Sequence, residues 1–146
     1  MQQSFENVHE VMTGAYKENN FCTVVSLAVA FNWSAGKAHR HMAKYGRKYR
    51  RGPEWDQYTK ALLDAAESEG KTVVFSRDWN GVTLNKFVKA HPTGTWFICV
   101  KGHITVLIDG KLNDWTAKTA GKRKIAYRSA FEMNGKYDYG IAKIEG

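Results

Sequence analysis

The stretch Asn19-Asn20-Phe21-Cys22-Thr23-Val24-Val25-Ser26-Leu27-Ala28-Val29-Ala30-Phe31 decides the fold that this chain predicts. Its polar beginning turns abruptly into an apolar run, and Cys22 stands at the boundary. A run that is apolar on nearly all sides is typical of a buried central helix, although its β-branched residues also permit a strand. At a helix N-terminus, unpaired N–H groups and the helix dipole favour a thiolate. We therefore expect a helix over 22–31 that begins at a reactive thiol.

Other helical patterns flank this stretch, most of them in the first half of the chain. We expect them over residues 4–16, 35–45, 56–69 and 84–90. Ser34 and Thr83 are suited to be the N-caps of the second and fourth of these, because their hydroxyls can accept from a first-turn N–H group. Gly46 and Gly70 follow the second and third, at positions where a helix commonly ends.

The second half of the chain is rich in β-prone residues. Strands are predicted over residues 94–100, 103–108, 111–115, 124–128 and 139–144, after an earlier short one over 72–75. Asp109-Gly110 is a hairpin turn signal between two of these runs. Helices first and an antiparallel meander afterwards predict an α+β architecture. Because the pattern shows no repeat and no linker, we expect residues 1–146 to form a single domain.

Composition narrows the kind of protein further. The chain has 146 residues, a formal net charge of +8 and two cysteines in unlike contexts, Cys22 and Cys99. Cys99 lies inside an apolar strand pattern and reads as a buried core residue. No CxxC or HExxH pattern is present, and we expect neither a metal nor a cofactor. The polar N-terminus and the lack of an apolar run of roughly 20 residues predict a cytoplasmic protein with reduced thiols and no membrane segment.

A histidine and a carboxylate follow Cys22 in an order that suits nucleophilic catalysis. His103 heads the strand pattern His103-Ile104-Thr105-Val106-Leu107-Ile108, and Asp114 lies beyond the turn that follows it. A thiol, a base and a group that orients the base are what acyl transfer through a cysteine requires. Asp109 is a rival carboxylate, but its place beside Gly110 suits a turn residue better. Trp115, next to Asp114, could shield the His–Asp pair from water.

The chain resembles the small papain-like cysteine peptidases of bacteriophages and bacteria. The resemblance is carried by Asn20-Phe21-Cys22-Thr23-Val24-Val25-Ser26-Leu27-Ala28, the helical pattern and basic run that follow it, Thr83-Leu84-Asn85-Lys86-Phe87-Val88, Gly94-Thr95-Trp96-Phe97, Gly102-His103-Ile104-Thr105-Val106-Leu107-Ile108-Asp109-Gly110 and Asp114. It implies a central nucleophile helix packed against the strands, with Cys22, His103 and Asp114 as a catalytic triad. Such enzymes also use an oxyanion donor shortly before the cysteine, which is usually the side chain of a glutamine or an asparagine. In this chain Tyr16 occupies the usual place of the glutamine, and the side-chain amide of Asn20 or Asn19 could substitute for it.

The function that this resemblance implies is cleavage of a peptide or isopeptide bond in a protein or peptide substrate. For a phage-encoded protein, the substrate would be a host protein and the site of action the host cytoplasm. A catalytically inactive papain-like module that engages a host protein is the first alternative. The second is a nucleic-acid-binding protein, because tyrosines interleave with basic residues that can contact phosphates. The candidate basic patch consists of Lys44, Arg47, Lys48, Arg50 and Arg51, with a second basic segment over 118–128.

Overall fold

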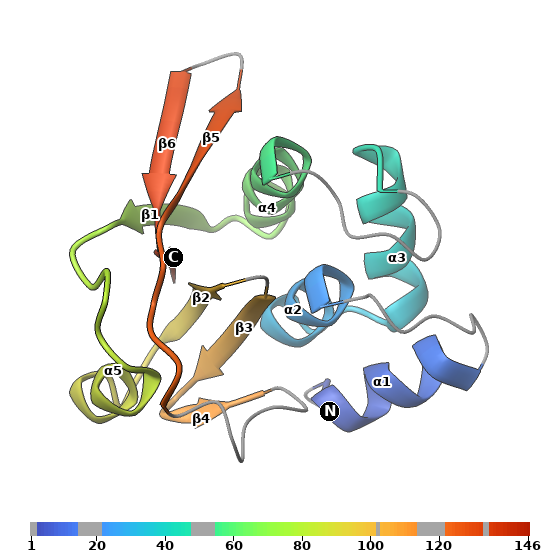
Figure 1. Cartoon of the computed structure of the whole chain (residues 1–146). Coiled ribbons are helices and arrows are strands. Elements are labelled where there is room, and N and C mark those ends of the chain that lie inside the picture. Colours follow the sequence, from blue (N-terminus) through green and yellow to red (C-terminus); the bar gives the residue numbers. More distant parts are fainter. Residues whose placement is uncertain (1–2, 15–21, 48–54, 102, 114–121, 133–134) are drawn as a thin grey trace.

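The architecture is α+β, as the sequence predicts. In a computed structural model, the structure describes residues 3–14, 22–47, 55–101, 103–113, 122–132 and 135–146. Over these residues it contains five helices and an antiparallel sheet of five strands, and four of the helices precede the first strand (Figure 1). The helices are α1 (Phe5–Gly14), α2 (Cys22–Phe31), α3 (Ala35–Lys44), α4 (Trp55–Ser68) and α5 (Leu84–Ala90). The strands are β1 (Thr72–Ser76), β2 (Thr95–Val100), β3 (His103–Ile108), β4 (Lys111–Leu112), β5 (Arg128–Glu132), β6 (Gly135–Tyr139) and β7 (Ile141–Glu145).

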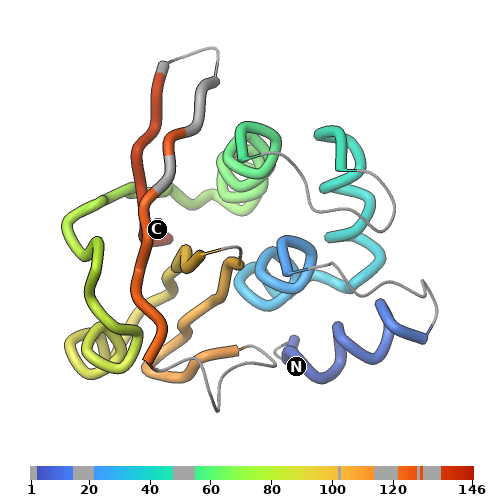
Figure 2. Tube along the Cα trace, in the orientation of Figure 1, coloured from blue at the N-terminus to red at the C-terminus, as the bar shows by residue number. Residues whose placement is uncertain are grey.

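Helix α2 lies at the centre of the helical layer. Every residue from Thr23 to Val29 is buried, which is why the sequence pattern is apolar on all sides. It contacts α1, α3, α4 and β3, so its surroundings are supplied from both halves of the chain (Figures 1 and 2). The predicted central helix that begins at Cys22 is confirmed. No helix among the described residues combines the length and the hydropathy that crossing a bilayer requires.

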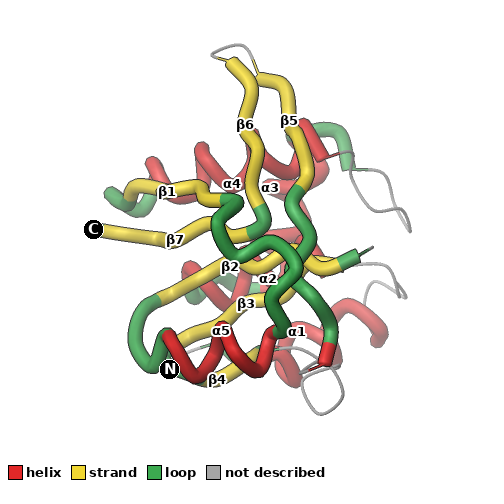
Figure 3. Tube along the Cα trace, turned by 60° about the vertical axis from the view of Figure 1, so that its left-hand side comes forward, coloured by secondary structure: helices red, strands yellow, loops and turns green. Residues whose placement is uncertain are grey.

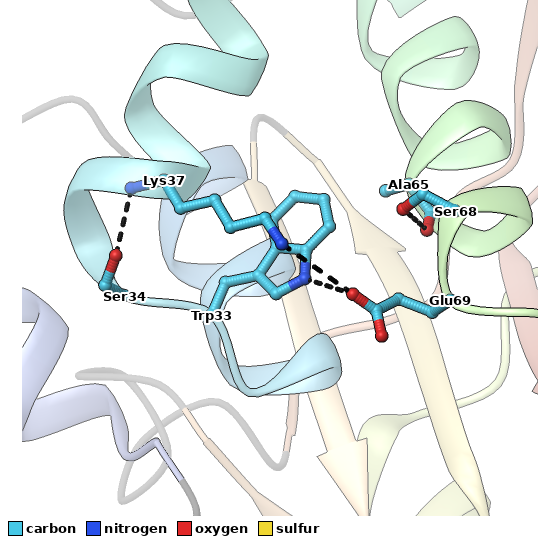
Figure 4. Close-up of polar contacts among 6 residues, drawn as sticks. All are labelled: Trp33, Ser34, Lys37, Ala65, Ser68 and Glu69. Atoms are coloured by element: carbon cyan, nitrogen blue, oxygen red, sulfur yellow. Dashed lines mark hydrogen bonds and ion pairs between the residues drawn. The ribbon is translucent and has the colours of Figure 1, made fainter.

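The C-terminal end of α2 is tied to two neighbouring helices through Trp33. The indole Nε1 donates to Glu69 Oε1 at 2.6 Å, and Lys37 Nζ lies 4.4 Å from the ring centroid and 3.9 Å from the same carboxylate oxygen (Figure 4). Ser34 caps α3 as predicted, because its Oγ accepts from Lys37 N at 3.1 Å. Gln3 adds a hydrogen bond from Nε2 to the Trp33 carbonyl at 3.0 Å. These contacts fix where α2 ends.

The sheet order is β1-β7-β2-β3-β4, and all of its pairings are antiparallel (Figure 3). Strands β2, β3 and β4 form the expected meander. The turn at Asp109 and Gly110 has φ values of 47° and 82°, which is the two-residue hairpin geometry that an Asp-Gly pair favours. Strand β7 differs from the prediction, because it lies between β1 and β2 rather than at the end of a meander.

The other differences lie between residues 122 and 145. The predicted strand over 124–128 is wrong: Lys124 and Ile125 make only isolated bridges, to Thr83 and Val100, and β5 begins at Arg128. Strands β5 and β6 pair as a separate hairpin that projects from the body (Figure 1). The strand predicted over 139–144 is divided at Gly140. A Cβ at that position would lie 2.8 Å from Ile125 Cγ2, so the close approach of these two segments requires glycine.

The two faces of the sheet are covered differently. Phe97, Cys99, Ile104 and Val106 belong to the core cluster that includes α2 and α4. The alternate residues of β2 and β3 belong to a second cluster with Leu84 and Phe87 of α5: they are Trp96, Ile98, Val100 and Leu107. This alternation is the period of two that a strand buried on both faces requires.

Candidate active site

Cys22 is the first residue of α2, the position that the sequence predicts for a reactive thiol. The first N–H groups of a helix have no acceptor within the helix, and the positive end of the helix dipole lies there. Cys22 is half-buried, whereas Cys99 is 1% exposed on β2. The two thiols therefore differ in both access and surroundings, and the prediction that Cys99 is a core residue is confirmed.

A pocket brings Cys22 and His103 together. Its empty volume is about 210 Å³, counting the space that is open to solvent at its mouth. Helix α2 contributes Cys22, Val25 and Ser26, and helix α1 contributes Phe5. The rest of the described lining is residues 103–106 of β3, and Asn113. Four consecutive strand residues alternate between the faces of the sheet, so the pocket lies at the edge of β3. Strand β4 leaves that part of the edge uncovered because it pairs only with Leu107 and Ile108.

His103 is positioned by the hairpin between β2 and β3. It is the first residue of β3 and pairs with Val100, the last residue of β2, so the reversal of the chain fixes its place. The ladder continues through Cys99 and Ile104, which lie on the sheet face covered by α2. The His103 side chain alternates with that of Ile104, and the pocket at the edge of β3 is the described feature that His103 shares with Cys22. A ring nitrogen in that place can exchange a proton with a thiol or with a leaving group.

Asn113 is the site residue that the sequence analysis missed. Its backbone N–H donates to the Val106 carbonyl at 2.8 Å, which extends the β3–β4 pairing by one residue and brings Asn113 into the pocket. Its Nδ2 donates to the Lys111 carbonyl at 3.0 Å. This bond fixes the orientation of the side-chain amide. Its Oδ1 atom can then accept a hydrogen bond from an imidazole N–H. We passed over Asn113 because the prediction sought a carboxylate, although the hairpin register could have indicated it.

A buried hydrogen-bond chain supports the pocket from below. Ser26, one turn after Cys22, donates from Oγ to the Thr23 carbonyl at 2.8 Å and lies 3.0 Å from the Tyr58 hydroxyl. Burial raises the pKa of Tyr58 well above its ordinary value, and the neighbouring Tyr139 adds to the shift. Tyr58 therefore stays protonated. Because the single Ser26 proton goes to Thr23, the Tyr58 hydroxyl donates to Ser26, and this order fixes both side chains.

Some of the remaining predicted site residues lie outside the described residues, and the others do not line the pocket. Asp114, Asn20, Tyr16, Trp115, Lys48, Arg50 and Arg51 lie outside the described residues. Asp109 is a turn residue as expected, with its Oδ1 accepting from Gly94 N at 2.9 Å. Lys44 is exposed, but Arg47 is 5% exposed and so does not belong to a solvated basic patch. Arg47 directly follows the last turn of α3, where its backbone N–H donates to the Met42 carbonyl at 3.1 Å.

Among the described residues, no group of three or more His, Cys, Asp or Glu side chains could hold a metal ion. Comparison of the chain with protein-family models, with curated proteins and with solved structures finds no match. The structural basis for a function is therefore the site itself, where a thiol at the N-terminus of a central helix and a histidine at the head of a strand line one pocket.

Proposed function

We propose that this protein is a papain-like thiol hydrolase that cleaves a peptide or isopeptide bond. The observation that carries the proposal is that Cys22 and His103, far apart in the sequence, line one pocket. The order of the parts supports it as well. A nucleophile begins the central helix, a base begins a later strand, and an amide directly follows the next strand, an order similar to that of the papain-like enzymes that the sequence resembles.

The chemistry follows from these positions. The Cys22 thiolate attacks the carbonyl carbon, and a C–S bond forms as the carbonyl π electrons move onto oxygen. The Cys22 backbone N–H, at the positive end of α2, is a donor for that oxyanion, and Asn20 is proposed as the second donor. When the tetrahedral species collapses, the C–N bond breaks and the proton held by His103 passes to the leaving amine. Water then attacks the thioester and gives its proton to His103. The C–S bond breaks, the acid leaves, and Cys22 is again a thiolate beside a protonated His103. No metal or cofactor takes part.

Asn113 is proposed to orient the imidazole in this cycle. Its Oδ1 can accept from one ring N–H and leave the other ring nitrogen turned towards Cys22. Asp114 remains a proposed partner of the same histidine. Either residue would act through His103 and not on the substrate, so both are positioning residues.

Selective modification of Cys22 tests the proposal. At neutral pH, iodoacetamide should alkylate Cys22 much faster than the buried Cys99, as mass spectrometry of the peptides would measure. Cys22→Ala should abolish labelling and hydrolysis, and Cys99→Ala is the matched control that should preserve both. Equal and slow alkylation of the two cysteines would contradict the proposal. A protein that labels selectively but keeps its full biological effect as Cys22→Ser would instead be a non-catalytic binding module.

Nucleic-acid binding is a second candidate, favoured by one observation. Lys122, Arg123 and Lys124 are all exposed, while their backbone is held by the hydrogen bond from Leu84 N to the Arg123 carbonyl at 2.9 Å. Three adjacent cations on a fixed segment can contact successive phosphates, in a chain whose net charge is +8. The candidate predicts an affinity for DNA or RNA that falls steeply with salt. Absence of a gel shift at low salt would exclude it.

A further inference from the structure

The basic segment 122–124 is fixed to the body through its backbone, while its side chains are exposed. Within the described part of the chain, no ion pair engages Lys122, Arg123 or Lys124. The segment runs beside the beginning of α5, where Leu84 N donates to the Arg123 carbonyl at 2.9 Å (Figure 1). Ile125, the next residue, is 1% exposed and belongs to the second core cluster. The three positive charges are therefore presented to solvent from a backbone that has a defined course.

An exposed aromatic ring follows this segment in the chain. Tyr127 is 43% exposed, and its backbone N–H donates to Asn80 Oδ1 at 3.1 Å. The Arg77 guanidinium carbon lies 5.3 Å from the centroid of the Tyr127 ring. Even a fully extended chain spans at most about 18 Å from Lys122 to Tyr127. The three cations and the ring thus lie close enough together to contact one short oligonucleotide.

The carboxylate that Arg77 contacts does not cancel the charge of the basic segment. Asp138 Oδ2 lies 3.8 Å from Arg77 Nη1 and 3.7 Å from Lys136 Nζ, and Asp138 Oδ1 accepts from Ser129 Oγ. Since Arg77 is already paired, we do not count it among the groups that contact phosphate. The positive charge at this place comes from residues 122–124, in a chain whose net charge is +8.

We propose that residues 122–127 form a binding site for single-stranded nucleic acid. Lys122, Arg123 and Lys124 contact successive phosphates, and the exposed Tyr127 ring stacks on a base. A duplex keeps the faces of its bases covered by their neighbours, so only an unpaired base can stack on Tyr127. This inference rests on the nucleic-acid candidate given above, which it deepens by naming the class of nucleic acid, and it does not involve the Cys22 pocket.

Fluorescence anisotropy with four labelled probes tests the site on the full chain. The probes are oligothymidylate and oligouridylate of about 12 nucleotides, the duplex of oligothymidylate with oligodeoxyadenylate, and an abasic oligomer with the same sugar-phosphate backbone. At least one single strand should bind roughly five- to hundredfold more tightly than the abasic oligomer, because stacking adds to the phosphate contacts. It should also bind more tightly than the duplex. The slope of its log affinity against log salt should be about −2, since each phosphate contact on a single strand contributes about −0.7.

Matched variants separate the ring from the charges. Tyr127→Ala should reduce the affinity for the single strand to about that for the abasic oligomer, and Tyr127→Phe, which keeps the ring, should preserve it. Lys124→Gln should make the salt slope shallower by about 0.7. Lys44→Gln removes the same charge from the exposed end of α3 and should leave the slope unchanged. Thermal melting confirms that each variant folds.

The outcomes distinguish this inference from both proposed functions. If the abasic oligomer or the duplex binds as tightly as the single strands, or if Tyr127→Ala changes nothing, the single-strand site is overturned and the broader nucleic-acid candidate stands. If Lys44→Gln changes the slope as much as Lys124→Gln does, the assignment to residues 122–124 is overturned. If no probe binds at low salt, the inference and the nucleic-acid candidate both fail. The hydrolase is tested separately, by the labelling of Cys22.

Discussion

The two ends of α2 are built in opposite ways. At the C-terminal end, Trp33, Lys37 and Glu69 engage one another and join three helices. At the N-terminal end, Cys22 lines a pocket together with His103, and no ion pair is found among its described lining residues. The difference teaches that one helix can be held at one end so that its other end can present a thiol. Changes at the C-terminal end should therefore alter stability and leave reactivity unchanged, and changes at the N-terminal end should do the reverse.

His103→Gln is expected to have the largest effect. Loss of the general acid and base should lower the rate of hydrolysis by about 10²- to 10⁴-fold, while the free energy of unfolding changes by less than about 1 kcal/mol. Hydrolysis rates and urea unfolding would measure the two quantities. The matched control is His91→Gln, because the His91 ring stacks on Phe87 with the ring centroids 4.0 Å apart and His91 is not among the described residues that line the pocket. That control should lower stability and keep hydrolysis, and the reverse pattern would break the comparison.

Asn113→Ala should have a smaller effect on the same reaction. Without an acceptor for its N–H, the imidazole spends less time in the productive orientation, and kcat should fall about tenfold with little change in KM. Asn113→Asp keeps an acceptor oxygen and should retain most of the activity. The pH profile of kcat/KM distinguishes a positioning role from a structural one. Only the loss of a positioning residue should shift the pH values at which kcat/KM falls. Asn85 on α5 is exposed, and Asn85→Ala should be silent.

Trp33→Phe tests the tied end of the helix. It removes the hydrogen bond to Glu69 but keeps an aromatic ring under Lys37. The free energy of unfolding should fall by about 1–2 kcal/mol, because an acceptor carboxylate loses its donor. Glu69→Gln, which keeps an acceptor oxygen, should cost less. The rate of Cys22 alkylation should not change in either variant. A slower rate would show that the two ends are coupled.

Tyr45 provides the smallest effect, and it depends on pH. Burial raises the pKa of Tyr45 from 10.0 to about 12, and the hydrogen bond from its hydroxyl to Asp64 adds to the shift. The folded state keeps the proton that the unfolded state begins to release near pH 10. This contribution to stability is therefore fully present below pH 10 and is lost as the pH rises to about 12. The difference in unfolding free energy between wild type and Tyr45→Phe should narrow over that window. A difference that stays constant would contradict the assignment.

The features that the sequence predicts well are the local ones. The beginning of α2, the Ser34 cap and the Asp109–Gly110 turn depend on residues within a few positions of one another. The place of β7 depends on pairings such as Thr72 with Glu145, which no local pattern encodes. Asn113 was missed for a different reason, because the prediction sought a carboxylate. The Asp109–Gly110 turn sets the hairpin register that places Asn113 beside Val106.

Burial of charge is another property that the sequence does not reveal. Arg47 lies in a run of basic residues and was expected on the surface, yet it is 5% exposed, at the end of α3. The β5–β6 hairpin was missed because Arg128-Ser129-Ala130-Phe131-Glu132 has few of the residues typical of strands. Its stability comes instead from pairing with β6 and from contact with α4.

The position of β7 between β1 and β2 also has a consequence for the order in which the parts of the fold form. The helices and the β2–β3 hairpin, which hold Cys22 and His103, rely on contacts between near neighbours and can form early. The sheet remains in two parts until β7, the last strand to be synthesised of those described, enters between them. Closing so long a loop is slow because its entropy is lost before the pairing is gained. During refolding, protection of the β7 amides from hydrogen exchange should therefore appear in a late phase, after most of the helical signal has already returned.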